Sequence, residues 1–160
     1  MSDKLKLVQT TDMAVVKSII SDSDIWEQAS QDGVSIDTYT PSNNSMCAWL
    51  LCSLGGDIIG LIYVHHDTNC ALLAHPYLLK KHVTKGREMM KLLFKWFDTL
   101  PSTVCKLNVS IPSSRRIAYN FAKKVGFKDE GINRASIIKD GVVCDQYLLG
   151  LTREEIKGLI

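Results

Sequence analysis

At 160 residues, 46% of them hydrophobic, the chain is long enough to bury a core, and its length predicts one domain covering residues 1–160. Nineteen Lys and Arg against seventeen Asp and Glu give a formal net charge of +2 with both signs scattered, so composition points away from nucleic acid and anionic membranes as partners. No run reaches the roughly 18 apolar residues of a membrane helix, and the start lacks the apolar segment of a signal peptide. We therefore expect a cytoplasmic protein.

Hydrophobic periodicity orders the chain as strand, two helices, three strands, helix, strand, helix and two strands. Strands are predicted at 4–8, 46–54, 58–66, 70–79, 105–111, 134–139 and 142–151. Helices are predicted from 11 or 12 to 20, from 23 or 24 to 32, from 87 to 100 and from 113 or 114 to 125. This order predicts an α/β fold in which helices flank a mixed sheet with antiparallel pieces.

Glycine and proline mark several of the boundaries. Gly33 and Gly126 stand where helices commonly end, and Pro101 stops the helix before it. The pairs at 55–56 and 140–141 have the composition of tight turns between antiparallel strands. The chain is therefore expected to contain two β-hairpins.

Five cysteines are an odd number, and most lie inside apolar runs, which is typical of buried, reduced thiols. A metal site built from Cys47, Cys52, His65 and His66 is the alternative, but these residues lack the spacing of metal-ligand motifs. We expect no metal.

The stretch KKHVTKGREMMKLL joins a predicted strand to a predicted helix through a short loop with one glycine, Gly86. The first N–H groups of a helix have no partner inside the helix, and with the helix dipole they favour a phosphate. Gly86 would let such a ligand approach the backbone, and cations surround it: Lys80, Lys81, His82, Lys85 and Arg87. The alternative is an ordinary loop with solvated lysines.

His75 is the first candidate for a general base. Strand alternation places His75, Tyr77 and Leu79 on one face, and an unperturbed histidine pKa of about 6.5 suits proton removal near neutrality. Pro76 is unusual in a central strand and predicts a bulge or a splay there. The alternative is a strand histidine with one ring nitrogen bonded to backbone.

The block from 110 to 155 carries the most specific pattern in the chain. A predicted helix ends in Gly126-Phe127, Glu130-Gly131 and Arg134 follow, and the last hairpin carries Gly141 and Asp145. This block resembles the C-terminal half of GNAT superfamily N-acetyltransferases of the RimJ/RimL type and of phage-encoded members. The resemblance spans nearly all of the chain and implies a GNAT-like acyl-CoA N-acyltransferase fold, with a central mixed sheet of six to seven strands.

The resemblance also implies acetyl-CoA as cofactor and a primary amine as acceptor, on a small molecule, peptide or protein, that attacks the thioester directly in a ternary complex. The pantetheine arm is expected to pair with residues 77–80 like a strand, and a backbone N–H there to polarise the thioester oxygen. Ser113 and Arg115 open the last helix, where they would meet the far end of the cofactor or only cap the helix. The predicted cofactor-binding set is Leu78, Leu79, Lys80, Val83, Thr84, Lys85, Gly86, Arg87, Glu88, Ser113 and Arg115.

Trp26, Tyr39 and Tyr77 are the predicted acceptor-binding residues, with ordinary amphipathic packing as the alternative for Trp26 and Tyr39. We expect a monomer or a homodimer.

Three positions depart from the GNAT pattern. The motif Q/R-x-x-G-x-G/A aligns with Val83, Gly86 and Glu88, and only its central glycine matches. Ala122 stands where many members carry a tyrosine that protonates the leaving thiolate, and Tyr119 lies three residues away from that position. The alternative function is therefore a GNAT-fold acyl-CoA-binding or protein-interaction module that has lost turnover.

Overall fold

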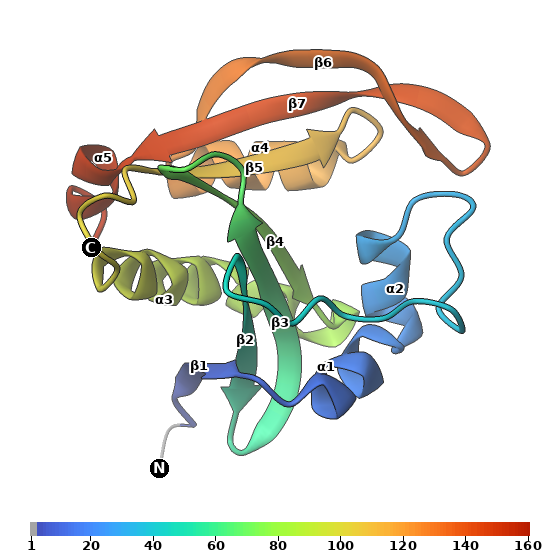
Figure 1. The fold of residues 1–160 in the computed structure, drawn as a ribbon, viewed down its shortest axis with the longest axis horizontal. Helices are drawn as coiled ribbons and strands as arrows, with labels where there is room; N and C mark the ends of the chain where they lie inside the picture. Colours follow the sequence, from blue (N-terminus) through green and yellow to red (C-terminus); the bar gives the residue numbers. More distant parts are fainter. Residues whose placement is uncertain (1–2) are drawn as a thin grey trace.

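The computed structural model describes residues 3–160 (Figure 1). Seven strands form one sheet in the spatial order β1-β2-β3-β4-β5-β7-β6, in which only the β4–β5 pair is parallel. The strands are β1 Leu5–Thr10, β2 Cys47–Leu54, β3 Asp57–His66, β4 Ala71–Leu78, β5 Lys106–Pro112, β6 Lys128–Lys139 and β7 Val142–Thr152. The predicted mixed sheet of six to seven strands is confirmed.

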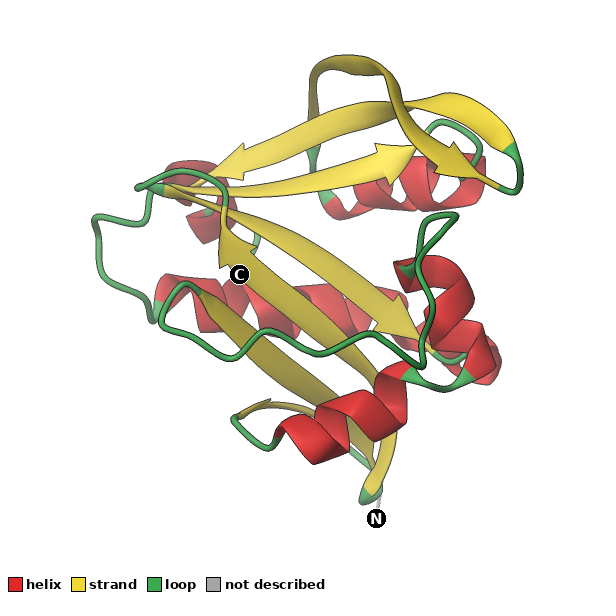
Figure 2. Ribbon diagram, turned by 45° about the vertical axis from the view of Figure 1, so that its right-hand side comes forward, coloured by secondary structure: helices red, strands yellow, loops and turns green. Residues whose placement is uncertain are grey.

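Five α-helices and one 3-10 helix accompany the sheet: α1 Met13–Ile20, α2 Ser23–Ala29, η1 Lys80–Lys85, α3 Gly86–Asp98, α4 Arg116–Val125 and α5 Arg153–Lys157. The views show α1 and α2 on one side of the sheet and α3 on the other (Figures 1 and 2). Within residues 3–160, no helix has the length and apolar character needed to cross a membrane.

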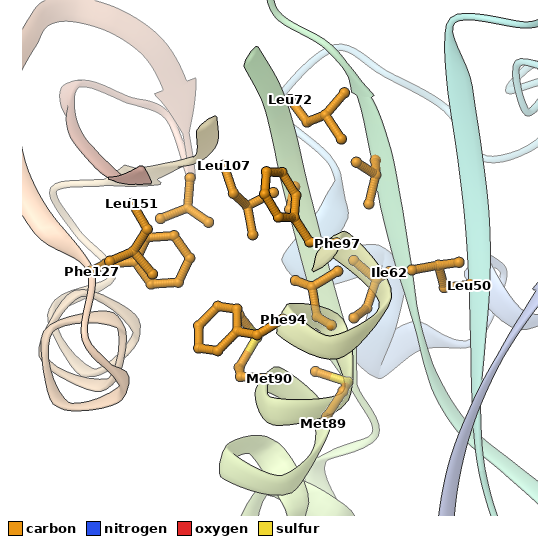
Figure 3. Packing of buried hydrophobic residues seen from close by; sticks show 14 of the residues in the cluster. Leu50, Ile62, Leu72, Met89, Met90, Phe94, Phe97, Leu107, Phe127 and Leu151 are labelled. Carbon is orange, nitrogen blue, oxygen red and sulfur yellow. The ribbon is translucent and has the colours of Figure 1, made fainter. Parts of the chain in front are cut away.

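Helix α3 fills the larger core because its apolar residues recur at helical spacing. Met89, Met90, Phe94 and Phe97 are buried against β-sheet side chains such as Leu107, as Figure 3 shows. A second, smaller core lies under α1 and α2, and Val16, Ile20, Ile25, Trp49 and Leu61 are its buried members. The sheet is thus apolar on both faces.

The two predicted hairpins are confirmed. Gly55 and Gly56 have φ of 60° and 93°, and Asp140 and Gly141 have φ of 54° and 77°, the positive values of a two-residue hairpin turn. Gly126 ends α4 with φ 117°, also as expected.

Three predicted boundaries are wrong. Helix α2 ends at Ala29, and Gly33 takes its positive φ in the turn that follows. Helix α4 begins at Arg116, because the preceding residues form a turn that the Ser113 N–H anchors to the Asp145 carbonyl. Strand β6 begins at 128, six residues earlier than expected, because two irregularities in its pairing with β7 break the period of two on which a strand prediction rests.

The cysteines are less buried than expected. All five are free thiols, but only Cys52 is buried, while Cys70 and Cys105 are exposed. The two exposed cysteines directly precede β4 and β5, and the Cys105 N–H donates to the Cys70 carbonyl where the parallel pair begins. Their side chains belong to neither core.

Candidate active site

Strands β4 and β5 pair over three residues and then diverge. Ala71–Leu73 lie in register with Lys106–Asn108, and no pairing with β5 continues along Ala74–Leu78 (Figure 2). We call the side of Ala74–Leu78 that faces β5 the free edge of β4. This divergence is the splay that Pro76 predicts from the sequence.

The pairing of β4 with β3 decides which backbone groups face the free edge. The Leu79 N–H donates to the Ile59 carbonyl at 2.9 Å, so Tyr77 and His75, two and four residues earlier, also direct their backbone groups at β3. The residues between these positions direct their backbone N–H and carbonyl groups away from β3. The backbone groups of Leu78 therefore point toward the free edge.

Of residues 77–80, where an N–H is expected to face the thioester, Leu78 is the one whose N–H points to the free edge. Tyr77 and Leu79 direct theirs at β3, and the Lys80 N–H donates to Asp24 Oδ2 at 3.1 Å. The Leu78 carbonyl accepts from Gln28 Nε2 at 3.0 Å, which ties α2 to the end of β4. Pro76, which lacks an N–H, also faces the free edge and so costs the β3–β4 ladder no bond.

Gly86 opens α3, and its lack of a side chain matters for packing. Its φ of −55° is available to any residue, and a Cβ would lie 3.1 Å from Cζ of Phe121 on α4. The glycine therefore lets α3 and α4 pack closely, and its expected role in admitting a ligand to the backbone stays a prediction.

The segment before α3 is a 3-10 helix and not an irregular loop. Lys85, the N-cap residue of α3, makes no side-chain capping bond, and its Nζ lies 3.4 Å from Glu88 Oε2, so the unexpected carboxylate is paired with a lysine. Val83, Thr84 and Arg87 are exposed beside them. Apart from the buried Gly86, the predicted phosphate-binding residues at the start of α3 thus lie at the surface.

Lys80 and Arg115 both form ion pairs with one carboxylate, that of Glu27, which the sequence did not single out. Glu27 of α2 has Oε2 3.1 Å from Lys80 Nζ and Oε1 4.0 Å from Arg115 Nη1, and its carbonyl accepts from Arg115 Nη2 at 3.1 Å. The hydrogen bond and charge of Lys80 lower the pKa of Glu27. Ser113 lies in the turn before α4, with its N–H on the carbonyl of Asp145.

A pocket of about 250 Å³ brings together His75 and the three predicted acceptor-binding residues. Its walls come from α1, α2, the segment after α2, and strands β2, β3 and β4: Ile20, Trp26, Ala29, Ser30, Gln31, Val34, Tyr39, Trp49, Tyr63, His75 and Tyr77. Sequence reasoning missed Trp49 and Tyr63, which stack at 4.3 Å between centroids. The alternation of side chains along β3 puts Tyr63 on the same face as His65. It does not show that Tyr63 lies opposite Trp49, because that pairing depends on a bulge at Cys52/Ser53 that shifts the β2–β3 register.

The ring of His75 is hydrogen-bonded to a second histidine. His75 Nε2 lies 3.1 Å from His65 Nε2, and His65 Nδ1 lies 3.0 Å from the carbonyl of His66, which can only accept. When both rings are neutral, His65 therefore carries its proton on Nδ1 and accepts at Nε2. His75 then donates from Nε2 and keeps a free lone pair on Nδ1.

Burial, with a smaller contribution from the charge of His65, lowers the pKa of His75 from 6.5 to about 4. Burial also raises the pKa of Tyr77 and of Tyr39. At neutral pH the pocket is therefore lined by a neutral imidazole and neutral phenols.

The lowered pKa predicts a pH dependence of stability. The unfolded chain binds a proton at residue 75 below pH 6.5 and the folded chain does so only near pH 4, so stability is complete above pH 6.5 and falls across this window. Lowering the pKa from 6.5 to about 4 corresponds to about 3 kcal/mol of stability. We expect urea midpoints at pH 7 and pH 4.5 to differ less in His75→Gln than in the unchanged protein. His66→Gln is the control and should keep the original difference; equal pH slopes in all three would contradict the prediction.

No cluster of three or more potential metal-ligating side chains is found among the described residues. The metal site considered from Cys47, Cys52, His65 and His66 is therefore not formed by the part of the chain that the structure covers.

Comparison with solved structures identifies the fold of the chain. No protein-family model and no curated protein matches the chain. A spermidine N-acetyltransferase of Vibrio cholerae, solved with CoA and spermine, is 13% identical with a TM-score of 0.77 over 96% of this chain and 98% of that one. A probable GNAT-family acetyltransferase from Chromobacterium violaceum is 15% identical with a TM-score of 0.76, covering 98% and 92%. The chain has the GNAT acyltransferase fold.

Proposed function

We propose that the protein is an acetyl-CoA-dependent N-acetyltransferase that transfers an acetyl group to a primary amine by direct attack in a ternary complex. The observation that carries this proposal is the free edge of β4, whose Leu78 N–H lies between the start of α3 and a pocket on the opposite face of the sheet. The spermidine N-acetyltransferase that shares the fold was solved with CoA and spermine, which supports a CoA cofactor and an amine acceptor.

The residues of the free edge fit the proposed cofactor. Acetyl-CoA would supply a thioester carbonyl ready for attack and an amide-bearing arm able to pair with a strand. The Leu78 N–H would donate to the acyl oxygen, and a fixed donor at a developing negative charge is a large source of rate enhancement. Ala74 and Pro76 would offer the remaining backbone groups on the same edge to the arm.

A second pocket, of about 180 Å³ between α3 and α4, fits the phosphorylated end of the cofactor. It is lined by Arg87, Met90, Lys91, Phe94, Lys124, Val125 and Leu159, which include three cations and no carboxylate. One of its lining residues, Arg87, belongs to the first turn of α3. We propose that Arg87, Lys91 and Lys124 bind the phosphates near the adenosine.

Removing two of these cations is expected to weaken acetyl-CoA binding. Lys91→Ala combined with Lys124→Ala should raise the calorimetric Kd about tenfold, because each lysine would lose a charge-assisted contact with a phosphate. The salt dependence of Kd should fall as well. Lys95→Ala, an exposed lysine one turn further along α3 and outside this pocket, is the matched control. An unchanged Kd in the double variant would remove this pocket from the cofactor site.

We propose that His75 and His65 remove the proton of the attacking amine together. His75 Nδ1 would accept the proton while the proton on its Nε2 passes to His65 Nε2, 3.1 Å away. His65 then carries both ring protons, and its Nδ1–H stays on the carbonyl of His66. The relay supports the assignment of His75 as base, because an imidazole with a pKa near 4 holds a proton poorly by itself.

The proposal is tested by titrating acetyl-CoA into the protein calorimetrically and then measuring thiol release with small amines, peptides and proteins. Binding followed by amine-dependent release is expected. Absence of binding at high micromolar acetyl-CoA would overturn the proposal. Binding without release across the panel would favour the alternative, a GNAT-fold module without turnover. Ala122, buried in α4, supports that alternative because its side chain cannot protonate the leaving thiolate.

We also propose the finer placement that the sequence suggests, near RimJ/RimL-type and phage-encoded members, in a cytoplasmic monomer or homodimer. Two residues of the resembling block support this placement through their structural roles. Gly126 ends α4 in the left-handed conformation, and Asp145 Oδ1 accepts from the Ala135 N–H at 2.8 Å, which holds the irregular turn of β6 against β7.

A further inference from the structure

We infer that the acceptor is a small primary amine carried on an aromatic or bulky apolar body, and that the pocket beside His75 discriminates against polyamines. This inference rests on the proposed function for the reaction and concerns only the acceptor. It follows from two features of the pocket, the chemistry of its walls and the charges placed around it.

Rings make up most of the pocket wall. Six of the eleven lining residues carry a ring: Trp26, Tyr39, Trp49, Tyr63, His75 and Tyr77. Trp26 and Tyr39 meet edge to face at 5.4 Å between centroids, and Tyr63 stacks with His75 at 5.7 Å and 21°. Such fixed faces and edges favour a flat apolar body.

The size of the pocket limits the acceptor. Its volume of about 250 Å³ lies below the roughly 300 Å³ at which typical small-molecule sites begin. The pocket therefore suits one ring system with a short amine-bearing arm.

No carboxylate lines the pocket, and the two nearest along the chain are already engaged. Asp32, next to the lining residue Gln31, accepts from the N–H groups of Asp140 at 3.0 Å and Gly141 at 2.7 Å, in the turn of the β6–β7 hairpin. Glu27 is paired with Lys80 and Arg115. A second ammonium of the acceptor would find no carboxylate in the pocket wall.

Two lysines set the electrostatic potential around the pocket instead. Lys17 Nζ donates to the carbonyls of Ile36 and Tyr39 and lies 5.6 Å from the centre of the Tyr39 ring. Lys139, only 7% exposed, donates from Nζ to the Ser30 carbonyl at 2.8 Å. A polyamine would bring further positive charge toward these fixed cations without a partner, at a cost in desolvation and repulsion.

The inference is tested first by binding, without cofactor. Trp26 and Trp49 line the pocket, so their fluorescence can follow titrations with phenethylamine and with spermidine. We expect phenethylamine to bind at least tenfold more tightly. Equal affinities, tighter spermidine binding, or no response to either amine would overturn the inference.

Gln31→Glu gives the sharper test because it adds one carboxylate to the pocket wall with almost no change in shape. We expect it to improve spermidine binding relative to phenethylamine about fivefold or more. Gln9→Glu, the same change on exposed β1 outside the pocket, should leave the ratio unchanged. An identical ratio in both variants would contradict the charge argument.

Thiol release with acetyl-CoA separates this inference from the proposed function. A higher kcat/KM for phenethylamine than for spermidine supports both, and the reverse preference overturns the inference alone. Failure of both amines to release thiol from a protein that binds acetyl-CoA counts against the proposed transferase activity, while the fluorescence preference still decides the chemistry that the pocket accepts.

Discussion

Replacing His75 by alanine is expected to lower kcat about 10²- to 10³-fold and to leave the Kd for acetyl-CoA unchanged. The magnitude is that of a lost general base. Cofactor affinity should be kept because the side chain of His75 faces the aromatic pocket, whereas the proposed cofactor contacts lie on the free edge of β4 and at the start of α3. Steady-state thiol release and calorimetry measure the two quantities.

Substitution of His65 shows whether the second histidine relays the proton or only positions the ring. His65→Gln can still accept a hydrogen bond from His75 Nε2, but it cannot take up a proton. A kcat as low in His65→Gln as in His65→Ala supports the relay, and a kcat restored by glutamine limits His65 to positioning. His66→Ala, outside the pocket, is the control. An unchanged kcat in His75→Ala would exclude His75 from the mechanism.

Gly60→Ala is expected to destabilise the protein by about 1 to 3 kcal/mol and to weaken acetyl-CoA binding. A Cβ on Gly60 of β3 would lie 2.3 Å from the carbonyl oxygen of Tyr77, a contact that is relieved only if β3 and β4 shift relative to each other. That movement would displace Leu78, whose N–H faces the free edge. Urea unfolding and calorimetry are the measurements.

Gly158→Ala is the matched control for this change. Gly158 has a φ of −73°, and the nearest atom to an added Cβ would be a helical carbonyl at an ordinary 3.4 Å. We expect little change in stability or in cofactor affinity there. If Gly60→Ala behaves like Gly158→Ala, the position of β4 is not fixed by its contact with β3.

Local patterns predicted most of the fold. The period of 3.6 in α3 and the glycine pairs in the two hairpins depend on neighbouring residues, so they can be read along the chain. The errors lie where distant partners decide the local conformation. Strand β6 was predicted too short because its irregular stretch is held in place by Asp145 on β7.

The candidate site, like the fold, was predicted only where local patterns along the chain determine it. His75 and Tyr77 share one strand, and the period of two puts both on one face, where they do line one pocket. Trp26 and Tyr39 are predicted acceptor-binding residues with amphipathic packing as the alternative, and the structure brings them to the same pocket. Trp49 and Tyr63 were missed because their stacking depends on the bulge in the β2–β3 register.

The order of the elements, the hairpins and the face of β4 that carries His75 follow from the sequence alone, because they depend on backbone preferences and on periodicity over a few residues. Three contacts depend on how the chain folds in space: the bond between His65 and His75, the pairing of Glu27 with Lys80 and Arg115, and the close approach of Gly86 to Phe121. These contacts join residues on different strands and helices. Their geometry is set by strand register and by helix packing, which no local pattern in the chain records.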